Sequence, residues 1–357
     1  MLRAEEINPL SPFYVDAASL GESGAILAWS AYEAPAIDAR RLGWDGGTDG
    51  PVHTALTYTE GSAEGLSLAA GHGLVALSTR TPHGLVVRPL ASDGAPLGAV
   101  VTLGGEVPLT MRASDARFDL FVGNRKSSYF GRVDLVRLDP QGAELRRSPL
   151  FTTAERQWLA NVSPGRATLP DGTFVAATRT LTDRVFQVVS RHFDADGTPV
   201  GPQQTLATLD VVQDGWLGVD VVPVAGGVLA AWQEVNPTAS RWVVQRLRND
   251  GTPDGDAYPP PTPLEVGDSE ALAPDVSGGA LFVFTSLVER GGSLHLLALG
   301  SDGRPRAAPL DPLEGTGIAP TTVIRLLTEG RRGLVVFTGG ETGRLPSIYA
   351  LPLECGP

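Results

Sequence analysis

The segment Asp194–Gly197, which reads DADG, carries two carboxylates followed by a turn residue, and this pattern could hold a calcium ion. A dedicated Ca²⁺ loop supplies about six or seven oxygen ligands, typically including a distal acidic residue in register. No such residue is evident here, and the related segments "LRNDG" and "LGSDG" lack the first aspartate. Asp-Gly between two strands is a strong hairpin signal, because such turns need residues that tolerate positive φ. We therefore predict a hairpin turn, with no metal and no cofactor.

Other residues that could do chemistry give no enzymatic pattern. The chain has no nucleophile elbow, phosphate loop or HExxH motif, and its single cysteine, Cys355, cannot form an intrachain disulfide. His192 occupies a position at which related segments carry arginine, so we interpret it as structural, and His83 is the histidine that we expect nearest to a site. The histidines show no metal-ligand spacing: His53, His72, His83, His192 and His295. No catalytic residue is predicted.

Composition excludes some classes of partner. The formal charge of −12 and the pI near 4.9 argue against binding to nucleic acid or to an anionic membrane surface, because both need a basic surface. No apolar run approaches the length of about 18 to 20 residues that a transmembrane helix needs. The amino-acid composition of the chain, with 43 Gly, 29 Pro and Lys126 as its one lysine, resembles that of exported bacterial proteins. We expect a monomer that is secreted, periplasmic or on the cell surface, with a signal peptide preceding residue 1; a cytoplasmic location stays open.

Two short patterns recur and predict the elements that position these residues. A motif ending in glycine, such as "QRLRNDG", occurs six times at a spacing of about 50 residues, with a large apolar residue four positions before each glycine. Its glycines are Gly46, Gly94, Gly142, Gly197, Gly251 and Gly303. A second pattern, a small turn opening an apolar strand as in "GGVLAAW", occurs seven times. The interval between the two patterns fits two strands joined by a loop, so the chain contains seven units.

One unit shows the expected strands. Residues 217–225 predict a first strand, Gly226 and Gly227 a tight turn, "VLAAWQE" a second strand, "RWVVQRLR" a third and "DGDAYPPP" a weaker fourth. Four strands in a meander at this spacing are typical of a β-propeller blade. The last unit stops where its fourth strand should begin, and we predict that residues 3–9 supply that strand. The resulting single domain, 1–357, has blades near 10–60, 61–108, 109–156, 157–210, 211–265, 266–318, and 319–357 with 1–9.

These units resemble those of bacterial seven-bladed β-propeller repeat proteins, and "RLRNDGTPDG" is similar to Delta-60-type repeats. The resemblance covers nearly the whole chain, whereas the Gly-His and Trp-Asp signature of WD40 repeats and the sialidase Asp-box are absent from the sequence. It implies an all-β fold, a seven-bladed β-propeller with four-stranded antiparallel blades and an N-terminal strand closing the last blade. Such families include enzymes, lectins and scaffolds, so the fold does not choose a function.

A candidate site follows from the predicted topology. Loops leading into first strands and loops between second and third strands should share one face, which we call the loop face. Trp29 and Trp232 end second strands at equivalent positions and are expected to pack between blades. The candidate ligand-binding residues on the loop face are Trp158, Trp216, Arg125, Lys126, Tyr129, Arg179, Glu234, Glu289 and Glu341. Further charged residues expected on the same rim are Glu33, Arg80, Asp183 and Arg290.

The charges on this predicted rim are divided, with cations in blades two to four and carboxylates in the others. Such a rim could orient a polar partner, although solvated loops would look the same. We predict a non-catalytic binding or scaffold module for a protein or glycan partner. The alternative is a glycoside hydrolase or lyase that uses carboxylates such as Glu234, Glu289 and Glu341 at the channel mouth. A hydrolase needs two carboxyl groups roughly 5 to 10 Å apart, one with a raised pKa.

Overall fold

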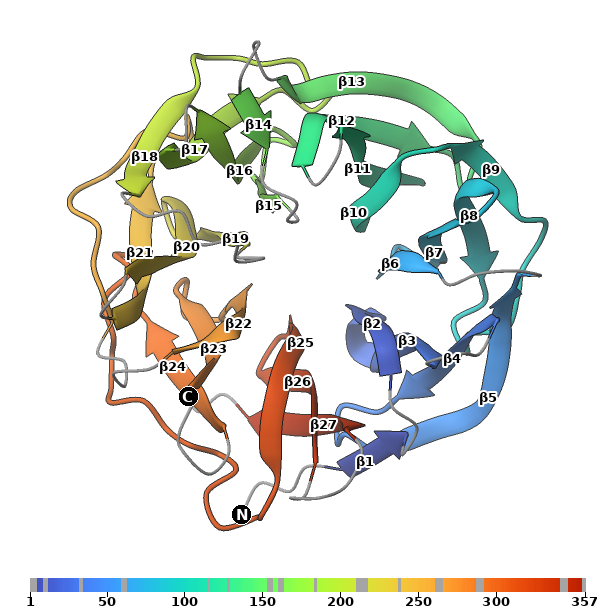
Figure 1. Cartoon of the computed structure of the whole chain (residues 1–357). Coiled ribbons are helices and arrows are strands. Elements are labelled where there is room, and N and C mark those ends of the chain that lie inside the picture. The colour runs from blue at the N-terminus through green and yellow to red at the C-terminus, as the bar shows by residue number, and fades with distance from the viewer. Residues whose placement is uncertain are drawn as a thin grey trace. The chain divides into compact units, whose positions relative to one another are not determined.

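The computed structural model describes residues 5–8, 12–31, 35–58, 63–114, 116–126, 129–152, 157–159, 164–182, 185–209, 218–236, 239–260, 266–286, 292–340 and 346–354. In these ranges the chain forms strands, apart from one short 3₁₀ turn, η1 (Gly21–Ser23). The chain divides into two compact units, which are described separately: residues 1–125, 134–147 and 324–357, and residues 126–133 with 148–323. Figure 1 shows the strands as successive small sheets.

The first unit holds the sheets nearest to the two ends of the sequence. Blade one consists of β2 (Pro12–Ser19), β3 (Ala25–Ala31), β4 (Ala36–Leu42) and β5 (Thr48–Thr57). Blade two consists of β6 (Glu64–Gly71), β7 (Leu74–Thr81), β8 (Gly84–Leu90) and β9 (Val101–Gly104). Blade three begins in this unit, with β10 (Val107–Ser114), β11 (Arg117–Lys126), β12 (Tyr129–Leu138) and β13 (Glu144–Thr152). Blade seven consists of β25 (Ala319–Glu329), β26 (Arg332–Gly340), β27 (Ser347–Glu354) and β1 (Glu5–Asn8).

The second unit holds the remaining blades. Blade four consists of β15 (Gly165–Thr168), β16 (Phe174–Thr182), β17 (Val185–Phe193) and β18 (Gln204–Leu209), and short β14 (Gln157–Leu159) also pairs with β16. Blade five has β19 (Val219–Val224), β20 (Gly227–Asn236) and β21 (Ala239–Leu247). Blade six has β22 (Val266–Pro274), β23 (Ala280–Ser286) and β24 (Ser293–Leu299).

The fold class is confirmed: the described part of the chain is all-β, with seven blades of antiparallel strands. In blades five and six the fourth strand is reduced to isolated bridges, such as Val244 with Tyr258 and Leu296 with Leu310. These segments are rich in proline, which lacks the N–H that a ladder needs. In each blade we call the end where the second strand leads into the third the loop end, and the opposite end the turn end.

The predicted packing positions are confirmed. Trp232 is fully buried and packs in one cluster with Val175 and Val188 of blade four, and Trp29 packs with Leu334 of blade seven. Every residue of β23 is buried, both the apolar run of residues 280–284 and the Thr285 and Ser286 that follow it. The core therefore lies between successive sheets, and each sheet is covered by its neighbours within a unit.

The recurring motif forms the predicted hairpin between third and fourth strands, but with a different turn. In blade two the Gly94 N–H donates to Ala91 O (3.0 Å), the Ala91 N–H donates to Ala95 O (2.8 Å), and Gly94 has a φ of +95°. The preceding residue, Asp93, does not adopt positive φ; its Oδ1 accepts the Ala95 N–H (3.0 Å). This pattern matches a type I turn followed by a left-handed glycine: neither central residue of the turn has positive φ, and only the closing residue, Gly94, needs it.

The aspartates of these turns are thereby committed to local hydrogen bonds. Asp194, the residue that raised the calcium question, accepts the N–H groups of Asp196 (2.9 Å) and Thr198 (2.7 Å) through Oδ1. Among the described residues, no group of three acidic, histidine or cysteine side chains could hold a metal ion. DADG thus forms the predicted turn, in which the Gly197 N–H donates to Asp194 O (3.0 Å).

The motif glycine also touches the third strand of the preceding blade. A Cβ on Gly94 would lie 3.0 Å from the Cβ of Ala39 in β4 and 3.2 Å from its carbonyl oxygen. A similarly close approach, at 3.1 to 3.2 Å, occurs for Gly46 on Ala350, Gly142 on Val87 and Gly303 on Val244, whereas Gly251 makes an ordinary contact with His192 at 3.5 Å. The left-handed φ is common to all six motif glycines, and at these four tightly packed positions a close approach to the preceding blade is a second reason for glycine.

We expect Gly94→Ala to lower the free energy of unfolding by about 3 kcal/mol, because left-handed strain and overpacking against Ala39 add. The matched control is Gly50→Ala, since Gly50 has a similar φ of +91° and a Cβ at this position would have no heavy atom within 4 Å. That control should cost about 1 kcal/mol. Urea denaturation of both variants measures the difference, and equal losses would show that the close approach between blades contributes nothing.

Candidate functional site

The structure describes two of the nine predicted site residues completely. Three lie outside the described residues: Trp216, Glu289 and Glu341. The same holds for Glu33, Asp183 and Arg290. For four others only the backbone is described: Arg125, Lys126, Tyr129 and Trp158. Trp158 was expected in a loop, but its backbone belongs to β14 and pairs with Leu181 of β16. The two complete ones are Arg179 and Glu234.

Arg179 is a buried link between blades four and five. It is 5% exposed, and its Nη2 donates to the carbonyl oxygen of Gln233 in β20. Burial lowers the pKa of Arg179 to about 10, against the opposing effect of the Glu270 and Glu234 carboxylates. The side chain therefore stays cationic at neutral pH. The sequence placed Arg179 on an accessible rim, whereas β16 continues to Thr182 and carries Arg179 inside the strand.

Glu234 belongs to an ion pair. Its Oε2 lies 2.7 Å from Arg241 Nη2, and the two residues are cross-strand partners in β20 and β21. Arg80 makes the equivalent contact in blade two, with 2.6 Å between its Nη1 and Glu64 Oε2. Opposite charges placed directly across a sheet stabilise each other. At these two described positions, each charged side chain of the predicted rim is therefore neutralised by a partner of opposite charge on the neighbouring strand.

A serine and a histidine in blade six form a pair that the sequence did not reveal. Ser286 Oγ lies 2.8 Å from His295 Nε2, and the imidazole stacks on Phe284 with 5.1 Å between ring centroids. Burial lowers the pKa of His295, although Asp311 opposes the shift. Such a pair can activate a hydroxyl group for attack on a substrate. Ser286 is only 1% exposed, however, so its hydroxyl serves as a buried link between β23 and β24.

The carboxyl group of Asp16 joins the first strands of three blades. Its Oδ1 accepts the Ala17 N–H (2.8 Å) and lies 2.8 Å from Arg325 Nε, and its Oδ2 accepts the Leu68 N–H (2.7 Å). Burial raises the pKa of Asp16, with the Arg325 charge and the two backbone bonds opposing the shift. Asp220 repeats the backbone contacts in the second unit, with Val221 (2.8 Å) and Leu272 (2.7 Å).

A hollow of about 640 Å³ lies at the turn ends of blades one and seven, in the first unit. Its lining is Glu22, Ser23, Gly43, Trp44, Asp45, Arg332, Pro352, Leu353 and Glu354. Trp44 is 8% exposed, and its Nε1 donates to Gly21 O (3.0 Å), which fixes the indole. The sequence contains a signal for this residue. Trp44 stands two positions before the motif glycine, where the other copies have Ser92, Pro140, Ala195, Asn249 and Ser301.

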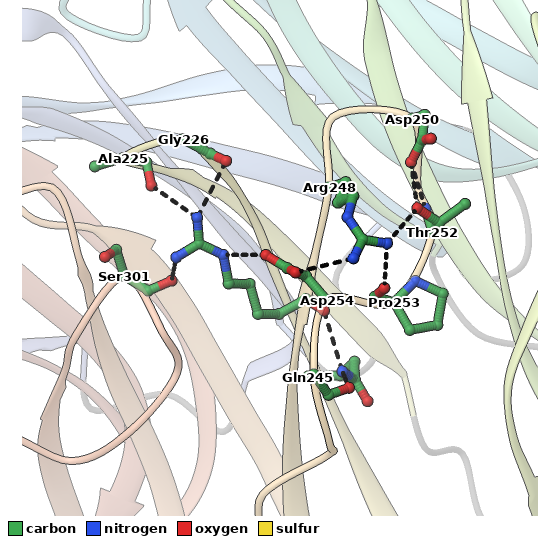
Figure 2. Close-up of polar contacts among 11 residues, drawn as sticks. Ala225, Gly226, Gln245, Arg248, Asp250, Thr252, Pro253, Asp254 and Ser301 are labelled. Atoms are coloured by element: carbon green, nitrogen blue, oxygen red, sulfur yellow. Dashed lines mark hydrogen bonds and ion pairs between the residues drawn. The ribbon is translucent and has the colours of Figure 1, made fainter.

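The turn end of blade five carries the same motif with its charged side chains paired. Arg246 Nε lies 3.0 Å from Asp254 Oδ2, while its Nη1 donates to Ser301 O (2.9 Å) of blade six. Figure 2 shows the contacts of a second guanidinium at this turn end, that of Arg248, with Asp254 and Pro253. Arg248 Nη2 lies 3.2 Å from Asp254 Oδ1. Arg41 and Asp49 repeat the first ion pair in blade one at 3.1 Å. The charged groups of this motif therefore satisfy one another and the backbone.

Comparison with known proteins separates fold from function. No protein-family model matches the chain, and no curated protein matches it. Solved structures do match. U3-55K aligns with a TM-score of 0.56 and 12% identity over 99% of this chain and 98% of that chain. A protein of unknown function from Dyadobacter fermentans aligns with a TM-score of 0.54 and 12% identity over 99% of both chains.

The WD40 β-propeller domain of Doa1 aligns with a TM-score of 0.50 and 10% identity over 97% of this chain and 95% of that chain. These similarities show a β-propeller fold. At such low identity they show the fold alone, and the finer resemblance to Delta-60-type repeats stays a prediction. Across the described ranges, no helix has the length and hydropathy needed to span a bilayer.

Proposed function

We propose that this chain is a non-catalytic binding or scaffold propeller that presents its loop face to a protein or glycan partner. The observation that supports it is the state of the described carboxyl groups. A general acid needs a raised pKa and access to substrate. Asp16 is a carboxyl group with a raised pKa, and it is buried and bonded to Leu68, Ala17 and Arg325.

The carboxylates on which the hydrolase alternative depends do not favour it in the described part of the chain. Glu234, one of these carboxylates, is held in an ion pair with Arg241 at 2.7 Å across the sheet. Glu289 and Glu341 lie outside the described residues, so no observation favours the hydrolase. The net charge of −12 disfavours nucleic acid as the partner. We further propose that the protein acts outside the cytoplasm as a monomer.

Immobilised wild-type protein should capture a protein or glycan in a pull-down combined with a glycan array. Trp216→Ala and Arg125→Ala, both on the predicted loop face, should each reduce capture about tenfold, because aromatic and arginine side chains dominate binding energy at such surfaces. The control is Arg248→Ala, which changes an exposed side chain at the turn end of blade five. Equal capture by all four proteins would refute the loop-face site, and hydrolysis of a captured glycan would refute the non-catalytic role.

A further inference from the structure

The hollow at the turn ends of blades one and seven contains charged side chains that form no ion pair. Glu22, Asp45, Arg332 and Glu354 line it and are exposed, and none of them has an ion-pair partner among the described residues. Asp45 uses one oxygen, Oδ1, to accept the Gly47 N–H (3.0 Å). Neighbouring arginines of the same unit behave differently, since Arg41, Arg80 and Arg325 are all paired.

The contact of Arg332 with Trp44 shows which chemical group the indole in the hollow attracts. Arg332 and Glu354 are directly opposite each other in β26 and β27, which is the position where an ion pair would be expected. The guanidinium lies instead over the indole of Trp44, with 6.0 Å between Cζ and the ring centroid. That distance is at the outer limit of a cation–π contact, so Arg332 holds the ring weakly.

We propose that this hollow is a binding site for an organic cation carrying a guanidinium or ammonium group. Three carboxylates and one guanidinium line it, so the charged groups sum to a negative site around an aromatic ring, which is the combination that recognises such cations. The volume of about 640 Å³ falls in the range of small-molecule sites, roughly 300 to 1,000 Å³. The same charged group occurs in two kinds of ligand: a free small-molecule amine, and an arginine or lysine side chain of a peptide.

The ligand competes with Arg332 for Trp44 in this arrangement. Arg332 is the cation already present, and its charge opposes the approach of a second one. Removing it should therefore strengthen binding of a cation, while removing a carboxylate should weaken it. An anionic ligand would respond with opposite signs, because it would lose its one positive partner. The site lies at the opposite strand ends from the loop face, and it goes beyond the function proposed above.

Isothermal titration calorimetry at low salt with two probes tests the site: agmatine, and acetyl-arginine amide as the peptide-like source of the same group. Both should bind the wild type. Arg332→Ala should lower the dissociation constant about two- to fivefold, and Glu354→Gln should raise it about two- to fivefold. Glu314→Gln, which removes an exposed carboxylate outside the lining, is the matched control and should leave the affinity unchanged.

Binding of agmatine alone would assign the site to free amines, and binding of acetyl-arginine amide alone would assign it to peptide side chains. Either result would support recognition of the cation. No binding of either probe to wild type and to Arg332→Ala would overturn the proposal. Weaker binding in Arg332→Ala, or an equal loss in Glu314→Gln, would also overturn it. Because these variants leave the loop face intact, failure here is distinguishable from failure of the pull-down with Trp216→Ala and Arg125→Ala.

Discussion

Deletion of residues 1–9 should lower the free energy of unfolding by about 3–5 kcal/mol, because it removes the whole of β1. That strand pairs antiparallel with β27, with Glu5 opposite Ala350, Glu6 opposite Tyr349 and, after a register shift, Asn8 opposite Ile348. Figure 1 shows β1 lying beside β27. Without it, backbone groups of β27 lose their partners, each lost hydrogen bond costs about 1 kcal/mol, and a new sheet edge is exposed.

Urea denaturation monitored by circular dichroism measures this loss, and light scattering follows the aggregation that an open edge promotes. The matched control removes residues 355–357, which lie beyond the end of β27. This second truncation should unfold at the wild-type midpoint. An unchanged midpoint for the deletion of residues 1–9 would show that pairing of β1 with β27 contributes no stability.

The sequence predicted most of the fold because its strongest signals are local. In six of the seven blades a motif glycine marks one hairpin, since the backbone there requires left-handed φ and, at Gly46, Gly94, Gly142 and Gly303, a close approach to the preceding blade. Trp29 and Trp232 were placed between blades from their equivalent positions in the repeat, and both are buried there. These features depend on the register of the repeat, which can be read directly from the sequence.

The site was less predictable because it depends on side-chain direction and on pairing across strands. Arg179 was taken for a loop residue, but β16 is long enough to bury it. Arg80 faces Glu64 only because the register of β6 and β7 shifts between Glu64 and Leu66, and nothing in the sequence predicts that shift. Trp44 was missed although it departs from the other copies of the motif. We therefore expect departures from the repeat, such as Trp44, to be a better guide to candidate sites in this chain than the repeat itself.

Asp16→Ala should lower the free energy of unfolding by about 2–5 kcal/mol at pH 7. The substitution leaves the N–H groups of Leu68 and Ala17 without their acceptor, and each unsatisfied buried donor costs about 1–3 kcal/mol. It also removes the partner of Arg325, but that side chain is 41% exposed and regains water, so its share is small. Urea denaturation measures the loss, and a change below about 1 kcal/mol would show that the three contacts are not stabilising.

The variant Arg325→Ala separates the charge of Asp16 from its backbone contacts. Burial raises the pKa of Asp16 above its ordinary value of 3.8, and Arg325 opposes this shift, so removing Arg325 raises the pKa further. A group with a raised pKa keeps its proton in the folded state at pH values where the unfolded chain has released it. Its contribution to stability is therefore lost as the pH rises through the folded pKa. Arg325→Ala should consequently lower the free energy of unfolding, relative to the wild type, by more at pH 7 than at pH 4. Urea denaturation at the two pH values measures both losses. A loss that is the same at both pH values would contradict this account of the buried carboxyl group.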